Sequence, residues 1–183
     1  MQRNSVRIIA GQWRRKTLSF PDQDGLRPTA DRVRETLFNW LGQDLPGLQC
    51  LDLFAGSGAL AFEAASRRAA HVIAIERNPV AYRNLLSSKA QLSASTVEII
   101  QADALLWLAR STAQFDVIFA DPPFAADLLG EVLRLALPRL TPEGLLYIEG
   151  ERLPTLPHTA AIHREGKAGK VRFALIKQAS SPD

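Results

Sequence analysis

The sequence feature that most constrains the fold is a glycine turn near residue 56. Residues 50–54 are apolar except for Asp52, as in a strand buried on both faces, and residues 59–65 are strong helix formers. Between them stand Gly56 and Gly58. A strand, a glycine turn and a helix form the first half of a βαβ unit, whose helix N-terminus offers free N–H groups to a ligand. The pattern predicts a nucleotide-type cofactor site in which Gly56 reverses the chain and Gly58 admits the ligand. Taken alone, it also fits an ordinary tight turn.

An acidic residue at the end of the next strand favours the cofactor interpretation. Residues 71–75 are apolar and lead to Glu76, 18 positions after Gly58. In dinucleotide-binding folds, an acidic residue about 20 positions beyond the glycines accepts hydrogen bonds from ribose hydroxyls. We therefore expect Glu76 to bind a ribose, with an ordinary strand-end carboxylate as the alternative.

Composition places the chain among single-domain globular proteins. It has 183 residues, of which 46% are hydrophobic and 22% charged, and Cys50 is its only cysteine. No stretch approaches the roughly 20 apolar residues that cross a bilayer, and the first residues lack a signal-peptide pattern. The three histidines show no metal-ligand spacing. We expect a cytoplasmic protein without a metal.

Basic residues gather at the N-terminus. Residues 1–34 carry a net charge of +5 and the remainder −2. Residues 6–20 are predicted to form a short hairpin, in which Arg14, Arg15 and Lys16 follow Trp13. Cations beside an aromatic ring suit RNA, although a solvated basic face is the other interpretation. We divide the chain into a basic hairpin extension over residues 1–25 and a cofactor-binding domain over residues 26–183.

Further acidic residues follow the later strands. Asp103 comes after the strand expected at residues 97–100, where it would contact an adenine amine, cap the next helix, or both. The strand expected at residues 115–120 leads into Asp121-Pro122-Pro123-Phe124. An acidic acceptor, a rigid unpaired carbonyl and an aromatic ring would then stand together at the ligand edge of the sheet.

The order of the elements indicates the fold class. Helices are expected from Thr29 to Leu41, from Asn78 to Leu92 with Val80, Leu85 and Leu86 packed, and near residues 128–140. Strands alternate with these helices, and two final strands surround a basic loop at residues 166–170. The sequence therefore predicts an α/β fold with an open, mostly parallel sheet covered on both faces.

With these motifs, the chain resembles the class I S-adenosylmethionine-dependent methyltransferases and, within them, the RsmD family, which methylates guanine N2 in 16S ribosomal RNA. The resemblance runs from residues 7–11 through Leu26-Arg27-Pro28-Thr29-Ala30-Asp31-Arg32 and residues 33–41 to the glycine turn and Asp121-Pro122-Pro123-Phe124. It implies a Rossmann-like, seven-stranded sheet whose last strand is antiparallel. One departure is that residues 13–16 lack the glycine that the family usually carries in this basic turn.

The resemblance also implies a set of functional residues. The catalytic set would be Asp121, Pro122 and Phe124. S-adenosylmethionine would be held by residues at the ligand edge, namely Asp52, Ala55, Gly56, Gly58, Glu76, Arg77, Asp103 and Ala104, with Thr29 closing over it. RNA would be bound by the basic residues Arg7, Arg14, Arg15, Lys16, Arg27 and Arg32. The partner would be 16S ribosomal RNA within the small subunit or its assembly intermediate, and the enzyme would be monomeric.

Chemistry gives these residues their roles. Hydrogen bonds from the guanine amine to Asp121 and to the Pro122 carbonyl would free the nitrogen lone pair for attack on the methyl group, while Phe124 stacks on the extruded base. Three alternatives remain open. An adenine-N6 methyltransferase uses the same Asp-Pro-Pro-aromatic pattern, a nicotinamide oxidoreductase shares the glycine turn, and a non-catalytic RNA-binding protein explains only the basic N-terminus.

Overall fold

The computed structural model describes residues 3–21, 31–123 and 128–179 of the chain. A small antiparallel hairpin, β1 (Arg3–Arg7) and β2 (Thr17–Pro21), precedes a seven-stranded sheet in the order β5-β4-β3-β6-β7-β9-β8. The strands of this sheet are β3 (Gln49–Asp52), β4 (His71–Glu76), β5 (Val97–Gln101), β6 (Phe115–Ala120), β7 (Leu140–Gly150), β8 (Ala160–Ala168) and β9 (Val171–Gln178). The first five of them run parallel, and β9 is antiparallel to both neighbours, as the resemblance implied.

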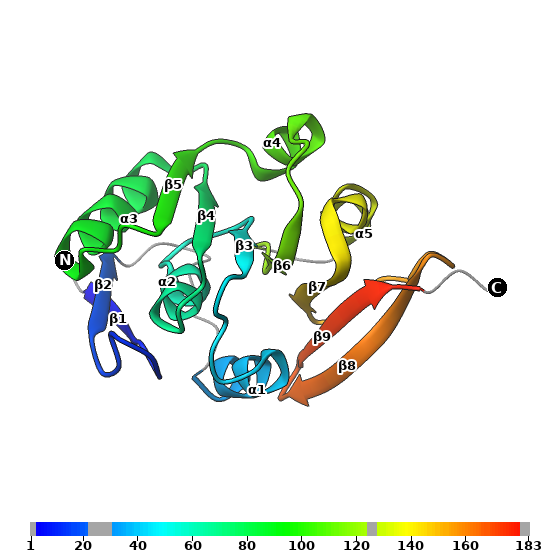
Figure 1. The fold of residues 1–183 in the computed structure, drawn as a ribbon, viewed down its shortest axis with the longest axis horizontal. Helices are drawn as coiled ribbons and strands as arrows, with labels where there is room; N and C mark the ends of the chain where they lie inside the picture. The colour runs from blue at the N-terminus through cyan, green and yellow to red at the C-terminus, as the bar shows by residue number, and fades with distance from the viewer. Residues whose placement is uncertain (1–2, 22–30, 124–127, 180–183) are drawn as a thin grey trace.

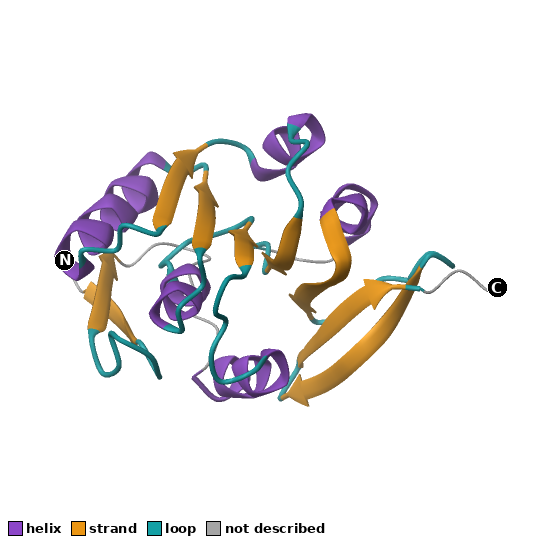
Figure 2. Ribbon diagram, viewed as in Figure 1, coloured by secondary structure: helices purple, strands orange, loops and turns teal. Residues whose placement is uncertain are grey.

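Helices cover both faces of the sheet, which confirms the expected α/β class (Figures 1 and 2). The helices are α1 (Asp31–Leu41), α2 (Ala59–Ser66), α3 (Pro79–Leu92), α4 (Ala104–Arg110) and α5 (Leu128–Ala136), the last continued by a 3-10 turn, Leu137–Arg139. One hydrophobic cluster joins α1, α2 and α3 to one face, and a second joins α4 and α5 to the other. No helix among the described residues is long and apolar enough to span a membrane.

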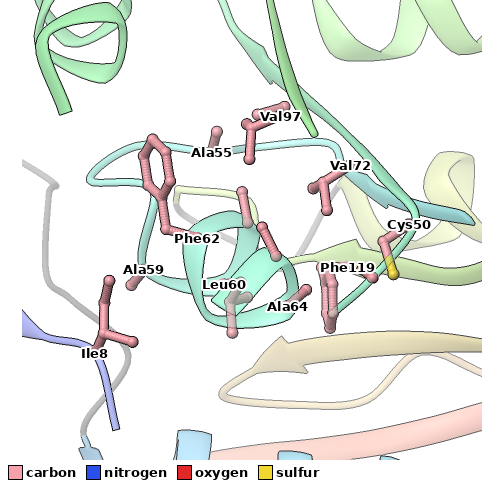
Figure 3. Packing of buried hydrophobic residues seen from close by; sticks show 14 of the residues in the cluster. Ile8, Cys50, Ala55, Ala59, Leu60, Phe62, Ala64, Val72, Val97 and Phe119 are labelled. Atoms are coloured by element: carbon pink, nitrogen blue, oxygen red, sulfur yellow. The ribbon is translucent and has the colours of Figure 1, made fainter. Parts of the chain in front are cut away.

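The central helix α2 is buried on all sides. Each of its eight residues is buried, including Glu63 and Ser66. Figure 3 shows its side chains in the middle of the first cluster, with Ile8 on one side and Cys50 and Phe119 on the other. Its small alanines allow this close packing. By contrast, Val80 and Leu86 of α3 are each 40% exposed, so the expectation that they pack was wrong, whereas Leu85 is fully buried.

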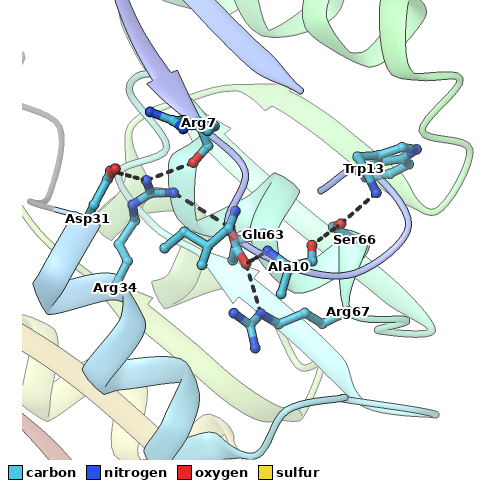
Figure 4. Close-up of polar contacts among 9 residues, drawn as sticks. Arg7, Ala10, Trp13, Asp31, Arg34, Glu63, Ser66 and Arg67 are labelled. Carbon is cyan, nitrogen blue, oxygen red and sulfur yellow. Dashed lines mark hydrogen bonds and ion pairs between the residues drawn. The ribbon is translucent and has the colours of Figure 1, made fainter. Parts of the chain in front are cut away.

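The N-terminal hairpin is attached to α2 by hydrogen bonds as well as by packing (Figure 4). The buried Glu63 carboxylate accepts the backbone N–H groups of Ile9 at 2.8 Å and Ala10 at 3.0 Å. One turn further along α2, Ser66 donates to the Ala10 carbonyl at 2.6 Å and accepts the Trp13 N–H at 3.0 Å. Val6, Ile8, Leu18 and Phe20 are buried in the first hydrophobic cluster. The hairpin and the helix therefore share one core.

Two arginines complete this buried network. Arg34 of α1 is fully buried; it donates to the Arg7 carbonyl at 2.9 Å and to Asp31 at 2.6 Å, and lies 3.6 Å from Glu63. Arg67 donates to Glu63 at 2.8 Å and lies over the ring of Phe38. Buried charges of this kind need partners, which Glu63 supplies to both arginines. Arg34 contributes to the N-terminal positive charge counted in the sequence, yet its burial makes it a structural residue that cannot contact phosphate.

Candidate active site

The glycine turn lies where the order of the strands in the sheet reverses. β3 pairs with β4 on one side and with β6 on the other, so the carboxyl end of β3 marks the switch point at which open α/β sheets bind ligands. Gly56 and Gly58 both adopt positive φ, at 52° and 81°. A Cβ on Gly58 would come within 2.6 Å of the Phe62 ring and 2.7 Å of Leu85. The need for glycine at position 58 therefore already follows from helix packing.

Glu76 connects the end of β4 to this turn. Its Oε2 accepts the Gly56 N–H at 2.9 Å, and its Oε1 accepts the Asn78 N–H at 2.7 Å. Asn78 in turn caps α3 through the N–H groups of Val80 and Ala81. Two carboxylate oxygens offer about four acceptor positions, so two remain for further donors. Arg77 follows at an exposed position.

Asp52 is the buried acid of the site, with 2% of its surface exposed. Burial is the main cause that raises the pKa of its carboxyl to about 7; hydrogen bonds from the backbone N–H groups of Phe54 and Ala61 oppose the shift, and the negative charge of Glu76 adds to it. Ala61 lies in the first turn of α2, where N–H groups lack helical partners. Asp52 therefore caps α2 from the neighbouring strand, and it is a buried acid that a nearby cation would ionise.

Asp103 and Ala104 stand after β5, the strand beside β4. The Asp103 side chain is the N-cap of α4 and accepts the Leu106 N–H at 3.0 Å. Asp103 therefore caps α4, which is one of the two roles that the sequence predicted for it. A hollow of about 390 Å³ borders Asp103, but its lining residues all belong to the segment 102–111. It is a surface hollow beside α4.

Asp121 and Pro122 occupy the carboxyl end of β6, adjacent to β3. Asp121 is half-buried and Pro122 buried, while Pro123 is exposed. β3 and β6 run parallel with Asp52 opposite Phe119, two residues before Asp121. The fold therefore brings Asp121 to the same edge as Asp52, Gly56 and Glu76. Phe124, Thr29 and Arg27 lie outside the described residues.

The next strand brings two residues that the sequence analysis did not single out. β7 pairs in parallel with β6 so that Ala120 lies opposite Ile148, which places Glu149 beside Asp121. The Tyr147 hydroxyl donates to Glu149 Oε2 at 2.6 Å. Burial, and then the charges of Glu149 and Asp121, raise the pKa of Tyr147 well above its usual value. The position of Glu149 at a strand's carboxyl end was the signal that could have identified it.

Three of the candidate RNA-binding residues, Arg14, Arg15 and Lys16, lie away from the glycine turn. Arg7, Arg14, Arg15, Lys16 and Arg32 are exposed. The turn that carries Arg14 to Lys16 is anchored at Ser66, the last residue of α2, whereas the glycine turn precedes the first residue. Eight helical residues span roughly 12 Å. The basic turn and the glycine turn therefore lie at opposite ends of one helix.

The basic turn reaches its shape without the glycine that the family usually carries. Arg15 adopts a φ of 69°, in the left-handed region that favours glycine. The Arg15 N–H donates to the Ile8 carbonyl at 2.9 Å, and the Lys16 carbonyl accepts from the Ile8 N–H at 2.9 Å. These two bonds hold an arginine in a strained conformation.

Among the described residues, no group of His, Cys, Asp or Glu side chains is arranged to hold a metal ion.

The fold, a seven-stranded sheet with its switch point at the carboxyl end of β3, is that of a class I methyltransferase. Residues 6–177 match the family model described as "Conserved hypothetical protein 95". The chain belongs to this family, which is the RsmD family of methyltransferases.

Curated relatives and a solved structure extend the comparison. Ribosomal RNA small subunit methyltransferase D of Escherichia coli K12 is 44% identical over 178 residues, covering 94% of this chain and 90% of that protein. Its namesake from Haemophilus influenzae is 39% identical, covering 96% and 95%. The solved structure of the Escherichia coli protein yhhF has a TM-score of 0.88 at 40% identity and covers 96% of this chain and 98% of that one.

Proposed function

We propose that this chain transfers a methyl group from S-adenosylmethionine to the N2 amine of a guanine in 16S ribosomal RNA, within the small subunit or its assembly intermediate. The observation that carries the proposal is the position of Asp121-Pro122 at the end of β6, beside the cofactor edge of β3 and β4. The names of its relatives, which act on ribosomal RNA of the small subunit, support the substrate. The enzyme would act as a cytoplasmic monomer.

The residues at the switch point fit this cofactor. When bound, S-adenosylmethionine supplies a methyl group on a positively charged sulfur, together with a ribose and an adenine. Asp52 would face its cationic part, because a buried acid with a raised pKa is stabilised as a carboxylate by a nearby positive charge. The remaining acceptor positions of Glu76 suit ribose hydroxyls. Ala55, Gly56, Gly58, Arg77, Asp103 and Ala104 would line the same edge, and Thr29 would close over it.

The acceptor side needs alignment more than a strong base, since the methyl group is already activated. The guanine amine is a weak nucleophile because its lone pair is delocalised into the ring. Asp121 and the Pro122 carbonyl would accept its two protons in hydrogen bonds, which favours a tetrahedral nitrogen with a localised lone pair. Asp121 or water then takes the proton released after methylation, and Phe124 would stack on the extruded base.

The proposal is tested with purified protein, methyl-labelled S-adenosylmethionine and small subunits that lack the modification. The RNA is then digested to nucleosides. Label in N2-methylguanosine is the expected result. Label in N6-methyladenosine would show that the target base is adenine, the alternative substrate for an Asp-Pro-Pro-aromatic site, and not guanine. Absence of label from small subunits, naked RNA and DNA alike, with S-adenosylmethionine still bound, would overturn the proposal.

A further inference from the structure

A second carboxylate, that of Glu149, lies beside Asp121 where strands β6 and β7 end. β6 and β7 are parallel neighbours, and their register places Glu149 next to Asp121. Phe119 and Tyr147, each two residues earlier on its strand, both belong to the cluster that faces α1 and α2. Because side chains alternate along a strand, Asp121 and Glu149 emerge on that same face. The influence of both carboxylates on Tyr147 agrees with this placement.

Tyr147 fixes the orientation of Glu149. The phenol is fully buried and donates to Oε2 at 2.6 Å. Burial raises the pKa of Glu149, whereas this hydrogen bond lowers it and so favours the carboxylate. A short bond to a rigid, buried donor holds one oxygen in place. Among the described residues, no donor to the second oxygen, Oε1, is found.

We propose that Glu149, positioned by Tyr147, accepts the N1–H of the target guanine and thereby selects guanine over adenine. The inference rests on the proposed function and deepens it. On its Watson–Crick edge guanine presents two neighbouring donors, N1–H and the N2 amine. Two adjacent carboxylates, Glu149 for N1–H and Asp121 for the amine, match that pattern. Adenine presents a lone pair at N1, which a carboxylate repels, so Glu149 would also disfavour the binding of adenine.

The test compares guanine with 2-aminopurine, which keeps the N2 amine but has a lone pair in place of N1–H. Small subunits are reconstituted with either base at the modified position, and kcat/KM for methyl transfer is measured. The wild-type enzyme is expected to prefer guanine by about tenfold or more, the value of one charge-assisted hydrogen bond. Glu149→Gln carries an amide N–H that can donate to N1 of 2-aminopurine, so its preference should fall to about threefold or less.

Tyr147→Phe tests the positioning role. It keeps the carboxylate and the ring but removes the hydroxyl, so the guanine preference should fall by less than in Glu149→Gln. Thermal unfolding and S-adenosylmethionine affinity verify that both variants remain folded. A Glu149→Gln variant that keeps the wild-type preference would overturn the inference while leaving the proposed function intact. A wild-type enzyme that methylates neither base would refute the function itself.

Discussion

Glu76 Oε2 accepts a hydrogen bond from the Gly56 N–H at 2.9 Å, so the glycine turn and the end of β4 are joined directly. Glu76→Ala removes this bond and the predicted ribose acceptor together. We expect S-adenosylmethionine affinity to fall by about 1.5–3 kcal/mol, measured by isothermal titration calorimetry. Glu98→Ala is the control, since Glu98 is an exposed carboxylate on the adjacent strand β5. Equal affinities for the two variants would remove Glu76 from the cofactor site.

Asp52 should make cofactor binding depend on pH. Its carboxyl has a pKa of about 7 in the free protein, and pairing with a cationic ligand lowers that value. Above pH 7 the carboxylate is already present; below it, binding must release a proton. S-adenosylmethionine affinity should therefore fall as pH decreases below 7, approaching about tenfold per pH unit. Asp52→Asn keeps an acceptor for Phe54 and Ala61 but does not titrate, so its profile should be flat. A wild-type profile as flat as that of the variant would contradict the assignment.

Asp121→Ala should separate chemistry from cofactor binding. Losing the acceptor for the target amine is expected to lower the methyl-transfer rate by roughly 10²–10⁴-fold, while S-adenosylmethionine affinity changes little. Single-turnover rates and calorimetry measure the two effects. Asp44→Ala, which removes an exposed carboxylate paired with Arg68, serves as the control and should leave both unchanged. Lost cofactor affinity with an unchanged single-turnover rate would place Asp121 outside the acceptor site.

Arg15→Gly should stabilise the fold and weaken RNA binding at once. The substitution relieves roughly 1–2 kcal/mol of left-handed strain and costs about 0.5–1 kcal/mol in chain entropy, leaving a net gain of up to about 1.5 kcal/mol. Arg14→Gly removes the same charge at a neighbouring position without positive φ, so it should only destabilise. Denaturant unfolding compares their stabilities. The slope of RNA affinity against salt should decrease by about 0.7–0.9 for each phosphate that the variant no longer neutralises. If Arg14→Gly stabilised the protein more than Arg15→Gly does, the claim that Arg15 is strained by its positive φ would be refuted.

Gly11→Ala should release the hairpin from α2. Gly11 has a φ of 81°, and a Cβ there would lie 1.9 Å from the Ser66 carbonyl oxygen. Gly47 has the same φ, but a Cβ there meets no atom within 4 Å. Gly47→Ala therefore measures backbone strain alone, about 1–2 kcal/mol. Gly11→Ala should cost clearly more, because its backbone must move away from Ser66. Equal losses of unfolding free energy would mean that the close approach to Ser66 is unimportant.

The sheet, and the position of most candidate site residues at the ends of its strands, could be predicted because they depend on local patterns. Buried strands read as apolar runs, and their carboxyl ends brought Asp52, Glu76, Asp103 and Asp121 to one edge. The buried network around Glu63 could not be predicted in this way. Its partners Ile9 and Ala10 are 54 and 53 residues distant, and nothing near Arg34 distinguishes it from an exposed helical arginine. The prediction for Val80 and Leu86 failed for the same reason, since only tertiary packing decides which face of α3 is covered.

We propose that the two ends of α2 have different functions, cofactor binding at the glycine turn and RNA binding at the basic turn, and this separation affects how the sequence can diverge. Substitutions more than about 7–10 Å apart with no shared partners have additive effects. The glycine turn and the basic turn lie roughly 12 Å apart along the helix. Substitutions in the exposed basic turn should therefore alter which RNA surface is bound without altering cofactor affinity. RNA preference can diverge between relatives while the methyl-donor site stays constant.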